Sequence, residues 1–456
     1  MKNLFREYKE GMLRMERELG CFFSVDELGA ENAFYQSEFR RCNQQVRSSV
    51  DGMVIALKDM ILCKGLPVCA GSRILEGYIA PYDATVVSRL KSSGAIIMGK
   101  LNQDEFAMGS SGENNPYKVS RNPWGLERVA GGSSSGSAAA VAADIIKGSL
   151  GTDTGGSVRQ PASFCGIVGF KPSYGRVSRY GIISYASSLD QIGVFSSNVK
   201  DVARILENIA GYDEKDLTSI NIEVPRYSSM LGREVKGIKV GILLNFLPDE
   251  LDEETKRFFD IVVLKLKQNH VELVSITIPY IESSISVYYI LATAEASSNL
   301  ARYDGLRYGQ IYKTDFNLEQ VYKKTRSAFL GEEVKRRILL GNYVLSSKHY
   351  DNYYLKAQSI RRKIRDEFEK AFEKVDVIIC PTTPTKAYKI GDKLHRPLEM
   401  YLGDIFTVPV NLIGLPGISV PIGCKDFPIG LQIIGKYFDE AMVLNLAHWV
   451  QEVRKE

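Results

Sequence analysis

Residues 131–176 read GGSSSGSAAAVAADIIKGSLGTDTGGSVRQPASFCGIVGFKPSYGR and contain two turns rich in glycine and serine. The compact apolar run between the turns predicts an Ala-rich helix of about twenty residues or fewer. A glycine-rich turn exposes several backbone amides, and Ser157 follows Gly155 and Gly156 in the second turn. A serine beside free amides is typical of an acyl-transfer nucleophile, so the stretch predicts a hydrolase or amidase.

Two simpler interpretations of these turns fit less well. Flexible linkers are polar on both sides, whereas these turns flank AAAVAADII and precede FCGIVGF, which we expect to be buried. A phosphate-binding loop of the G-x-x-x-x-G-K-[ST] type needs a lysine directly after its last glycine. Here Ser157 is followed by Val158 and Arg159, which disfavours nucleotide binding at this turn.

The composition excludes several classes of protein. The 456 residues are 45% hydrophobic and 25% charged with a net charge of +4, which is typical of a globular protein and low for one that grips nucleic acid by itself. The N-terminal stretch MKNLFREYKEGMLRMEREL predicts an amphipathic helix, and no apolar run approaches the roughly 18 residues of a membrane span. We therefore expect a cytoplasmic protein that uses neither membrane nor DNA.

The cysteines point to a reducing compartment. They are odd in number and form no C-x-x-C pair, so they predict neither a disulfide framework nor a zinc site. The seven are Cys21, Cys42, Cys63, Cys69, Cys165, Cys380 and Cys424.

Short apolar segments alternate with helical patterns along most of the chain. Residues 1 to about 48 predict helices and turns that lead into a first strand, MVIALK (53–58). Strands separated by helix-period segments predict a mixed sheet covered by helices on both faces, an α/β fold. The further segments are a helix at 84–94, a strand at 95–100, a helix at 199–211, strands at 237–244 and 375–385, a helix at 361–374 with pairs Lys363/Glu367 and Arg365/Glu369, and a buried loop and strand at 411–423.

A nucleophilic serine needs a base. The four histidines, His270, His349, His395 and His448, lie in no glycine-rich or hydroxyl-rich setting, which disfavours a Ser-His-Asp triad. A lysine can replace histidine if its pKa falls by about 3 units, a differential interaction of roughly 4 kcal/mol that burial can supply. Lys58 ends the apolar strand Val54 to Leu57 and meets this condition, although a lysine at a strand end is usually solvated.

The segments VIALKDM (54–60), GGSSSGSAA (131–139) and SLGTDTGGSVRQP (149–161) together resemble the amidase signature family. The resemblance implies a Ser-Ser-Lys triad of nucleophile Ser157, bridging Ser133 and base Lys58, with a cis peptide bond between Gly132 and Ser133. It also implies an oxyanion hole formed by the amides of Thr154, Gly155, Gly156 and Ser157. The chain departs from the family at Ser135, commonly glycine, and at Met60, often asparagine.

The resemblance also implies the fold and the domain organisation. The fold would be the amidase signature fold, a central mixed twisted sheet with helices on both faces. The whole chain, 1–456, would be one amidase domain with an N-terminal helical segment (1–48), a signature core (49–215) and a remainder (216–456) that carries the substrate pocket.

Four later segments, 292–309, 331–346, 400–421 and 428–440, resemble the glutamine-hydrolysing branch of the family, which serves tRNA-dependent amidotransferases. Glutamine carries an α-carboxylate and an α-ammonium, so the resemblance implies that Arg337 binds the carboxylate, Asp404 binds the ammonium and Tyr303 lines the pocket.

The branch also implies partners and cofactors. Two further subunits, of the B and C type, would complete a heterotrimer and would hold most of the contact with misacylated tRNA. This chain would bind no cofactor or metal, while a partner would use ATP and magnesium to convert Glu-tRNA(Gln) to Gln-tRNA(Gln). Two alternatives remain open: a free-standing amidase acting on another small amide, and a structural subunit with an inert triad.

Overall fold

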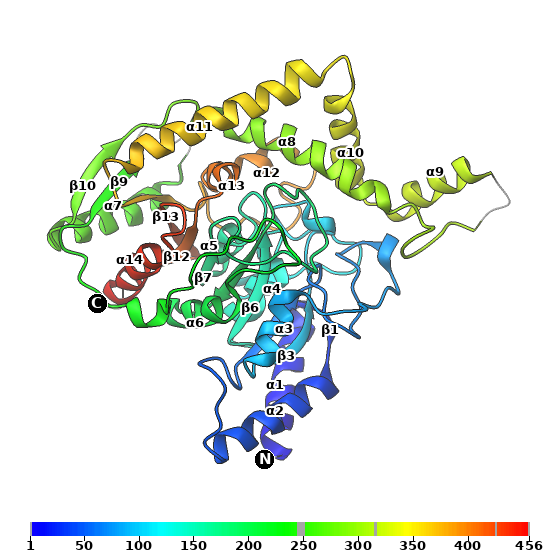
Figure 1. Ribbon diagram of the computed structural model, residues 1–456, viewed down its shortest axis with the longest axis horizontal. Helices are drawn as coiled ribbons and strands as arrows, with labels where there is room; N and C mark the ends of the chain where they lie inside the picture. The colour runs from blue at the N-terminus through cyan, green and yellow to red at the C-terminus, as the bar shows by residue number, and fades with distance from the viewer. Residues whose placement is uncertain (1, 244–250, 314–316, 425, 455–456) are drawn as a thin grey trace.

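A mixed sheet of eleven strands forms the middle of the computed structural model, which describes residues 2–243, 251–313, 317–424 and 426–454 (Figure 1). The strands are β1 (Phe22–Val25), β2 (Val54–Lys58), β3 (Ile96–Leu101), β6 (Gly148–Asp153), β7 (Val168–Lys171), β8 (Gln191–Ser196), β9 (Lys239–Leu243), β10 (Glu272–Ile276), β11 (Val377–Pro381), β12 (Gly417–Cys424) and β13 (Pro428–Gly435). Their order across the sheet is β1-β3-β2-β6-β8-β7-β12-β13-β11-β9-β10. A separate antiparallel pair joins β4 (Arg121–Asn122) to β5 (Gly125–Val129).

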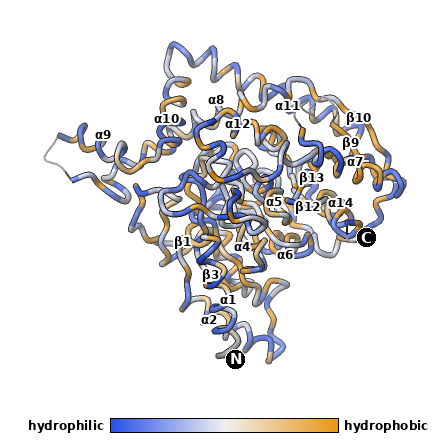
Figure 2. Tube along the Cα trace, turned by 180° about the vertical axis from the view of Figure 1, so that it is seen from behind, coloured by the Kyte–Doolittle hydropathy of each residue, from blue (hydrophilic) through white to orange (hydrophobic). Residues whose placement is uncertain are grey.

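Helices lie on both faces of this sheet and at its ends (Figure 1). They are α1 (Lys2–Leu19), α2 (Glu27–Cys42), α3 (Thr85–Ser92), α4 (Ser135–Ala142), α5 (Arg159–Cys165), α6 (Val199–Ile209), α7 (Glu253–Gln268), α8 (Ser284–Asn299), α9 (Leu318–Phe329), α10 (Glu332–Leu345), α11 (Lys356–Phe372), α12 (Pro397–Leu402), α13 (Val408–Ile413) and α14 (Glu440–Val453). Figure 2 shows hydrophilic and hydrophobic residues mixed along the peripheral α11, as expected for a helix with one buried face. None of the helices in the described residues is both long and apolar enough to cross a membrane.

Alternating side chains divide the core into two layers. In β2, Ile55 and Leu57 join the cluster packed under α3, α6, α7 and α14, whereas Ala56 joins the cluster under α4 and α5. Successive side chains of a strand point to opposite faces, so Lys58 lies on the same face as Ala56. The sequence therefore directs the last side chain of β2 toward α4 and α5.

The carboxyl ends of several strands meet at one edge of the sheet. Strand β2 pairs in parallel with both β3 and β6, so Lys58 and Asp153 end neighbouring strands at the same edge. Strand β8 runs antiparallel to β6, which brings Asp190, just before β8, to this edge as well. Residues far apart in the sequence thus converge on one end of the sheet.

One expectation for the N-terminal half was wrong. The first strand is β1, because Phe22–Val25 pairs antiparallel with β3, so residues 1–48 are not only helices and turns. The predicted Ala-rich helix is confirmed as α4, which ends at Ala142, and strand β6 follows it and leads into the second turn. Gly148 and Gly151 agree with an end of the helix before β6, since glycine is unfavourable in the interior of a helix.

Other sequence predictions can be compared directly. Strands were found within 53–58, 95–100 and 375–385 and helices within 84–94 and 199–211, each near its predicted bounds, and α11 includes 361–372. In α11 Arg365 pairs with Glu369 at 3.6 Å, but Glu367 pairs with Lys370 and not with Lys363, which lies over the ring of Tyr280. The predicted strand 237–244 is observed as β9, with its last position outside the described residues.

Candidate active site

Lys58 is fully buried at the end of β2 and contacts two hydroxyl groups. Its Nζ lies 2.6 Å from Ser133 Oγ and 2.9 Å from Thr152 Oγ1. Burial lowers the pKa of Lys58 to about 7, and this effect exceeds the opposing influence of the carboxylates of Asp104, Asp153 and Asp190. A lysine in this setting is neutral in a large fraction of molecules near pH 7 and can accept a proton.

The turn that carries Ser133 is held from both sides. The Gly132 amide donates to Gln160 Oε1 at 3.0 Å, which ties this turn to α5 directly after the second turn. The Asp104 amide donates to the Ser133 carbonyl at 3.1 Å. The peptide bond between Gly132 and Ser133 is cis, as the family resemblance implies.

The turn at 154–158 is shaped by one buried carboxylate. Asp153 accepts the amides of Gly156 at 2.9 Å and Val158 at 3.1 Å, and Arg159 Nη2 lies 2.9 Å from its Oδ1. Burial alone would raise the pKa of Asp153, but the Arg159 guanidinium lowers it to about 2. The carboxylate is thus ionised and keeps the turn in one conformation.

Arg159 in turn connects the turn at 154–158, named the nucleophile turn below because it carries the candidate nucleophile Ser157, to the C-terminal half of the chain. Its five N–H donors are all used: those not bound to Asp153 bind the Thr407 carbonyl at 2.9 Å, Gln432 Oε1 at 2.6 Å and Asn411 Oδ1 at 2.5 Å. A buried guanidinium is tolerated only with this degree of pairing. The network therefore fixes the distance between α5 and α13.

The structure narrows the set of amides that can stabilise an oxyanion. The Gly156 amide already donates to Asp153, so its proposed part in the hole does not fit this geometry. Within the described residues the amides of Thr154, Gly155 and Ser157 have no acceptor and remain free. Ser157 is 9% exposed, whereas Lys58 and Ser133 are inaccessible, so it is the member of the three that a substrate can reach.

Two further side chains, which the sequence interpretation missed, support these free amides. The Thr154 hydroxyl donates to Asp190 Oδ1 at 2.7 Å, and the Thr407 hydroxyl donates to the Gly155 carbonyl at 2.7 Å. Gly156 has a φ of +134°, and a Cβ there would lie 2.1 Å from the Thr407 hydroxyl oxygen. Glycine is therefore required at this position.

Arg337 lies in a cage of aromatic rings. Its guanidinium carbon is 5.2 Å from the ring centre of Tyr289 and 5.6 Å from that of Tyr401, and Nη1 donates to the Tyr185 hydroxyl at 2.8 Å. Its Nε donates to Glu333 Oε1 at 2.8 Å, and Nη2 makes no hydrogen bond within the described residues, so the Nη2 side is available for a ligand. This arrangement holds the plane of the guanidinium ready for a carboxylate.

Asp404 is buried in the turn before α13. Its carboxylate accepts a hydrogen bond from the Ser110 hydroxyl, and burial raises its pKa to about 7. The same turn is joined to the nucleophile turn, since Thr407 contacts both the Asp404 carbonyl and the Gly155 carbonyl. A buried acid with an elevated pKa is common at functional sites.

The two candidate pocket tyrosines have different surroundings. Tyr303 packs against Phe106 with ring centres 5.0 Å apart and against Tyr308 at 6.0 Å. Tyr288, in α8, lies at the nucleophile turn, where its hydroxyl oxygen would be 2.8 Å from a Cβ at Gly155. Sequence reasoning missed Tyr288, whose only local signal was its place in a pair of adjacent tyrosines in α8.

The two departures from the family pattern are both accommodated. Ser135 begins α4 and has no left-handed backbone, and Gly112, with a φ of +83°, leaves space for its side chain. Met60 is buried, and its Sδ accepts a hydrogen bond from the Thr152 hydroxyl at 3.1 Å. Both side chains therefore fit without a left-handed backbone, and among the described residues the buried Ser135 hydroxyl has no hydrogen-bond partner.

In the described residues no group of three or more His, Cys, Asp or Glu side chains could hold a metal ion.

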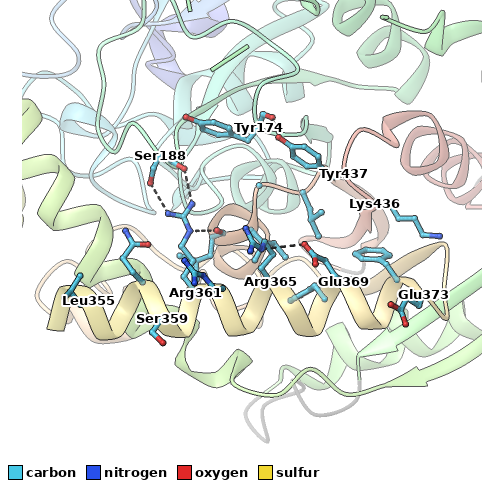
Figure 3. A pocket seen from close by; sticks show the side chains of 18 residues that line it. Tyr174, Ser188, Leu355, Ser359, Arg361, Arg365, Glu369, Glu373, Lys436 and Tyr437 are labelled. Carbon is cyan, nitrogen blue, oxygen red and sulfur yellow. Dashed lines mark hydrogen bonds and ion pairs between the residues drawn. The ribbon is translucent and has the colours of Figure 1, made fainter. Parts of the chain in front are cut away.

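A groove of about 1180 Å³ lies away from the triad, between α11 and the end of α13 (Figure 3). Arg361 crosses it: Nε donates to the Leu412 carbonyl at 2.6 Å, and Nη1 donates to Ser188 Oγ at 3.2 Å. Ser188 belongs to the loop that carries Asp190, and Leu412 follows Asn411 in α13. Arg361 therefore links α13 to the loop that carries Asp190, on the side of these elements that faces away from the candidate active site.

Comparison with known proteins gives a consistent result. The profile of the family described as Amidase matches residues 4–444. The chain is 48% identical over 455 residues to the A subunit of the glutamyl-tRNA(Gln) amidotransferase of Thermoanaerobacter pseudethanolicus, covering 99% of this chain and 92% of that protein. It is 54% identical over 397 residues to the protein of the same name from Persephonella marina, covering 87% and 82%.

A solved structure agrees with the sequence relatives. The crystal structure of the A subunit of the glutamyl-tRNA(Gln) amidotransferase from Thermotoga maritima superimposes with a TM-score of 0.81 at 39% identity, covering 97% of this chain and 90% of that one.

Proposed function

Because this chain belongs to the amidase family, we propose that it is the glutamine-hydrolysing subunit of a glutamyl-tRNA(Gln) amidotransferase. It releases ammonia from the side chain of glutamine, and a partner subunit uses the ammonia to convert Glu-tRNA(Gln) to Gln-tRNA(Gln). The observation that carries the substrate assignment is the presence of two buried groups of opposite charge type, Arg337 and Asp404, of which Asp404 is linked to the nucleophile turn through Thr407. Glutamine offers one charge to each, whereas a simple amide offers none.

The reaction begins with the transfer of a proton. Neutral Lys58 takes the proton of Ser133, Ser133 takes that of Ser157, and Ser157 Oγ attacks the side-chain amide carbon of glutamine. The free amides of Thr154, Gly155 and Ser157 stabilise the negative oxygen of the tetrahedral intermediate, at about 3 to 4 kcal/mol for a donor that is removed. The proton returns through Ser133 to the leaving nitrogen, ammonia departs, and a glutamyl ester remains on Ser157.

Water completes the cycle. The same three residues remove a proton from water, which attacks the ester and releases glutamate. Arg337 binds the α-carboxylate through its Nη2 side and Asp404 binds the α-ammonium, so the amide carbon is presented to Ser157 in one orientation. No step in this chain requires a metal ion or cofactor, and ATP and magnesium act in the partner subunit, which also binds most of the misacylated tRNA.

The complex that we propose is a heterotrimer with subunits of the B and C type, in the cytoplasm. The test is ammonia release from glutamine, with and without these partners and misacylated tRNA. We expect release that rises with the partners and is lost in Ser157→Ala.

Two truncated substrates separate this proposal from a free-standing amidase. Glutaramate lacks the ammonium of glutamine, and 4-aminobutanamide lacks its carboxylate. We expect Asp404→Asn to raise the KM for glutamine but not for glutaramate, and Arg337→Met to raise the KM for glutamine but not for 4-aminobutanamide. Rapid turnover of an unrelated amide, unchanged in either variant, would instead support the free-standing amidase.

A further inference from the structure

Four polar atoms form a continuous buried chain at the end of β2. Lys58 Nζ lies 2.6 Å from Ser133 Oγ on one side and 2.9 Å from Thr152 Oγ1 on the other. Thr152 Oγ1 lies 3.1 Å from Met60 Sδ. The four residues are each no more than 1% exposed, so no solvent competes for these contacts.

We propose that Met60 is a positioning residue that sets the direction of proton transfer in the site by accepting the hydrogen of the Thr152 hydroxyl. The inference rests on the proposed role of Lys58 as base. A thioether sulfur carries no hydrogen of its own and can only accept a hydrogen bond, whereas a hydroxyl can both donate and accept one. The Thr152 hydrogen therefore points to Met60, and a lone pair of Thr152 Oγ1 points to Lys58.

This polarity decides what Lys58 offers to Ser133. A neutral amine has two N–H groups and one lone pair. With Thr152 oriented as an acceptor, one N–H of Lys58 is bound to Thr152 Oγ1, and a second faces the Thr152 carbonyl at 3.5 Å. The lone pair is left for the Ser133 hydrogen, as the transfer from Ser157 through Ser133 requires.

The backbone keeps the sulfur in place. The Met60 amide donates to Gln103 Oε1 at 3.0 Å, and the Met60 carbonyl accepts the Ile183 amide at 3.0 Å. Thr152 is fixed in β6 between β2 and β8. The contact between sulfur and hydroxyl therefore follows from the positions of two strands and does not depend on an exposed side chain.

The charged groups that face Lys58 come from three other elements, and none is altered by a change at Met60. Asp104 follows β3, Asp153 ends β6 and Asp190 precedes β8, and each carboxylate favours the protonated lysine. The sulfur acts differently, because it favours one orientation of a neutral hydroxyl.

Met60→Leu removes the acceptor and nearly preserves the volume. The Thr152 hydroxyl is then free to donate to the lone pair of Lys58, which stabilises the neutral amine and competes with Ser133. We expect the acid limb of the pH profile of kcat to move down by about 0.5 to 1 unit, kcat on the plateau to fall about 3- to 10-fold, and the KM for glutamine to stay within about 2-fold.

Two control variants test whether Met60 acts through Thr152. In a Thr152→Val background Met60→Leu should produce no further shift of the acid limb, whereas in a Thr152→Ser background, which retains the hydroxyl, the shift should persist. Met98→Leu is the matched control for loss of a buried sulfur, since Met98 lies in β3 within the cluster under α4 and α5. It should leave the acid limb in place.

The same shift is measurable without glutamine. Phenylmethylsulfonyl fluoride forms a sulfonate ester on a reactive serine with loss of HF, so its rate of adduct formation on Ser157 against pH reports the base directly. This readout separates the two proposals, because the adduct does not depend on glutamine as substrate. An acid limb for Met60→Leu within about 0.2 unit of wild type in this assay, or an equal shift in the Thr152→Val background, would overturn the inference.

Discussion

Replacing Lys58 by methionine tests the burial of the base through protein stability. The unfolded chain keeps the ordinary pKa of lysine, 10.5, while burial lowers the pKa in the native state to about 7. Below pH 7 both states bind the proton and the native state carries the full penalty of a buried ammonium. Between pH 7 and 10.5 the unfolded state binds more protons than the native state, so the stability of the wild type rises with pH.

The size of the shift in the Lys58 pKa determines how much the free energy of unfolding changes with pH. The shift destabilises the wild type by about 4.7 kcal/mol at pH 6 and by about 2 kcal/mol at pH 9. Lys58→Met lacks this titration, and its lost hydrogen bonds to Ser133 and Thr152 contribute a nearly constant cost. The stability of the variant relative to wild type should therefore fall by about 2.7 kcal/mol between the two pH values.

Differential scanning calorimetry measures this difference. With an unfolding entropy of about 2.1 cal/mol/K per residue over 456 residues, 1 kcal/mol corresponds to about 1 °C. We expect the melting temperature of Lys58→Met, relative to wild type, to fall by about 3 °C between pH 6 and pH 9. Lys200→Met, at an exposed position on α6, is the matched control and should show no such trend. A difference between Lys58→Met and wild type that is independent of pH would refute the lowered pKa and the base role that depends on it.

Three further predictions concern the turn and the pocket. Gly156→Ala should lower kcat for ammonia release at least about 100-fold, because its Cβ would lie 2.1 Å from a hydroxyl oxygen and the turn that holds the free amides must move. When glutamine binds to Ser157→Ala at pH 7, about half a proton should be released, because the glutamine ammonium favours the ionised form of Asp404, whose pKa is about 7. Titration calorimetry in buffers of different ionisation enthalpy measures the number of protons released. Proton uptake would contradict the pairing of Asp404 with the ammonium. Tyr288→Phe should raise the KM for glutamine more than Tyr303→Phe, which steady-state kinetics would decide, since the Tyr288 hydroxyl lies at the nucleophile turn.

Local sequence patterns predict part of this fold and miss what depends on distant partners. Strand β2 was predicted because it is a short continuous apolar run, and helix α6 because its apolar residues recur with the helical period. Strand β1 was missed because its four residues form a strand only through pairing with Leu101 and Gly99, more than 70 positions away. The intrinsic strand propensity of these four residues carries no information about a pairing strand so far away in the sequence.

The site divides in the same way. Glycine-rich turns and an apolar strand led to Ser157 and Lys58, since these features are contiguous in the sequence. Thr152, Asp104 and Asp190 could not be found from their neighbours, because the parallel pairing of β2, β3 and β6 and the antiparallel pairing of β6 with β8 bring them together. A carboxylate at the end of an ordinary strand has no local feature that marks it as facing a lysine.

The catalytic and the substrate-binding groups of the site come from different segments of the chain, and this separation affects how the site can evolve. The groups that we propose break the amide bond come from strand ends and turns between residues 58 and 190, whereas the two charges that we propose select the substrate come from α10 and from the turn before α13. A lineage can therefore acquire a different substrate by mutation of the later segment while the earlier one stays unchanged. Arg159 and Thr407 connect the two segments, so mutational drift at either residue would affect both.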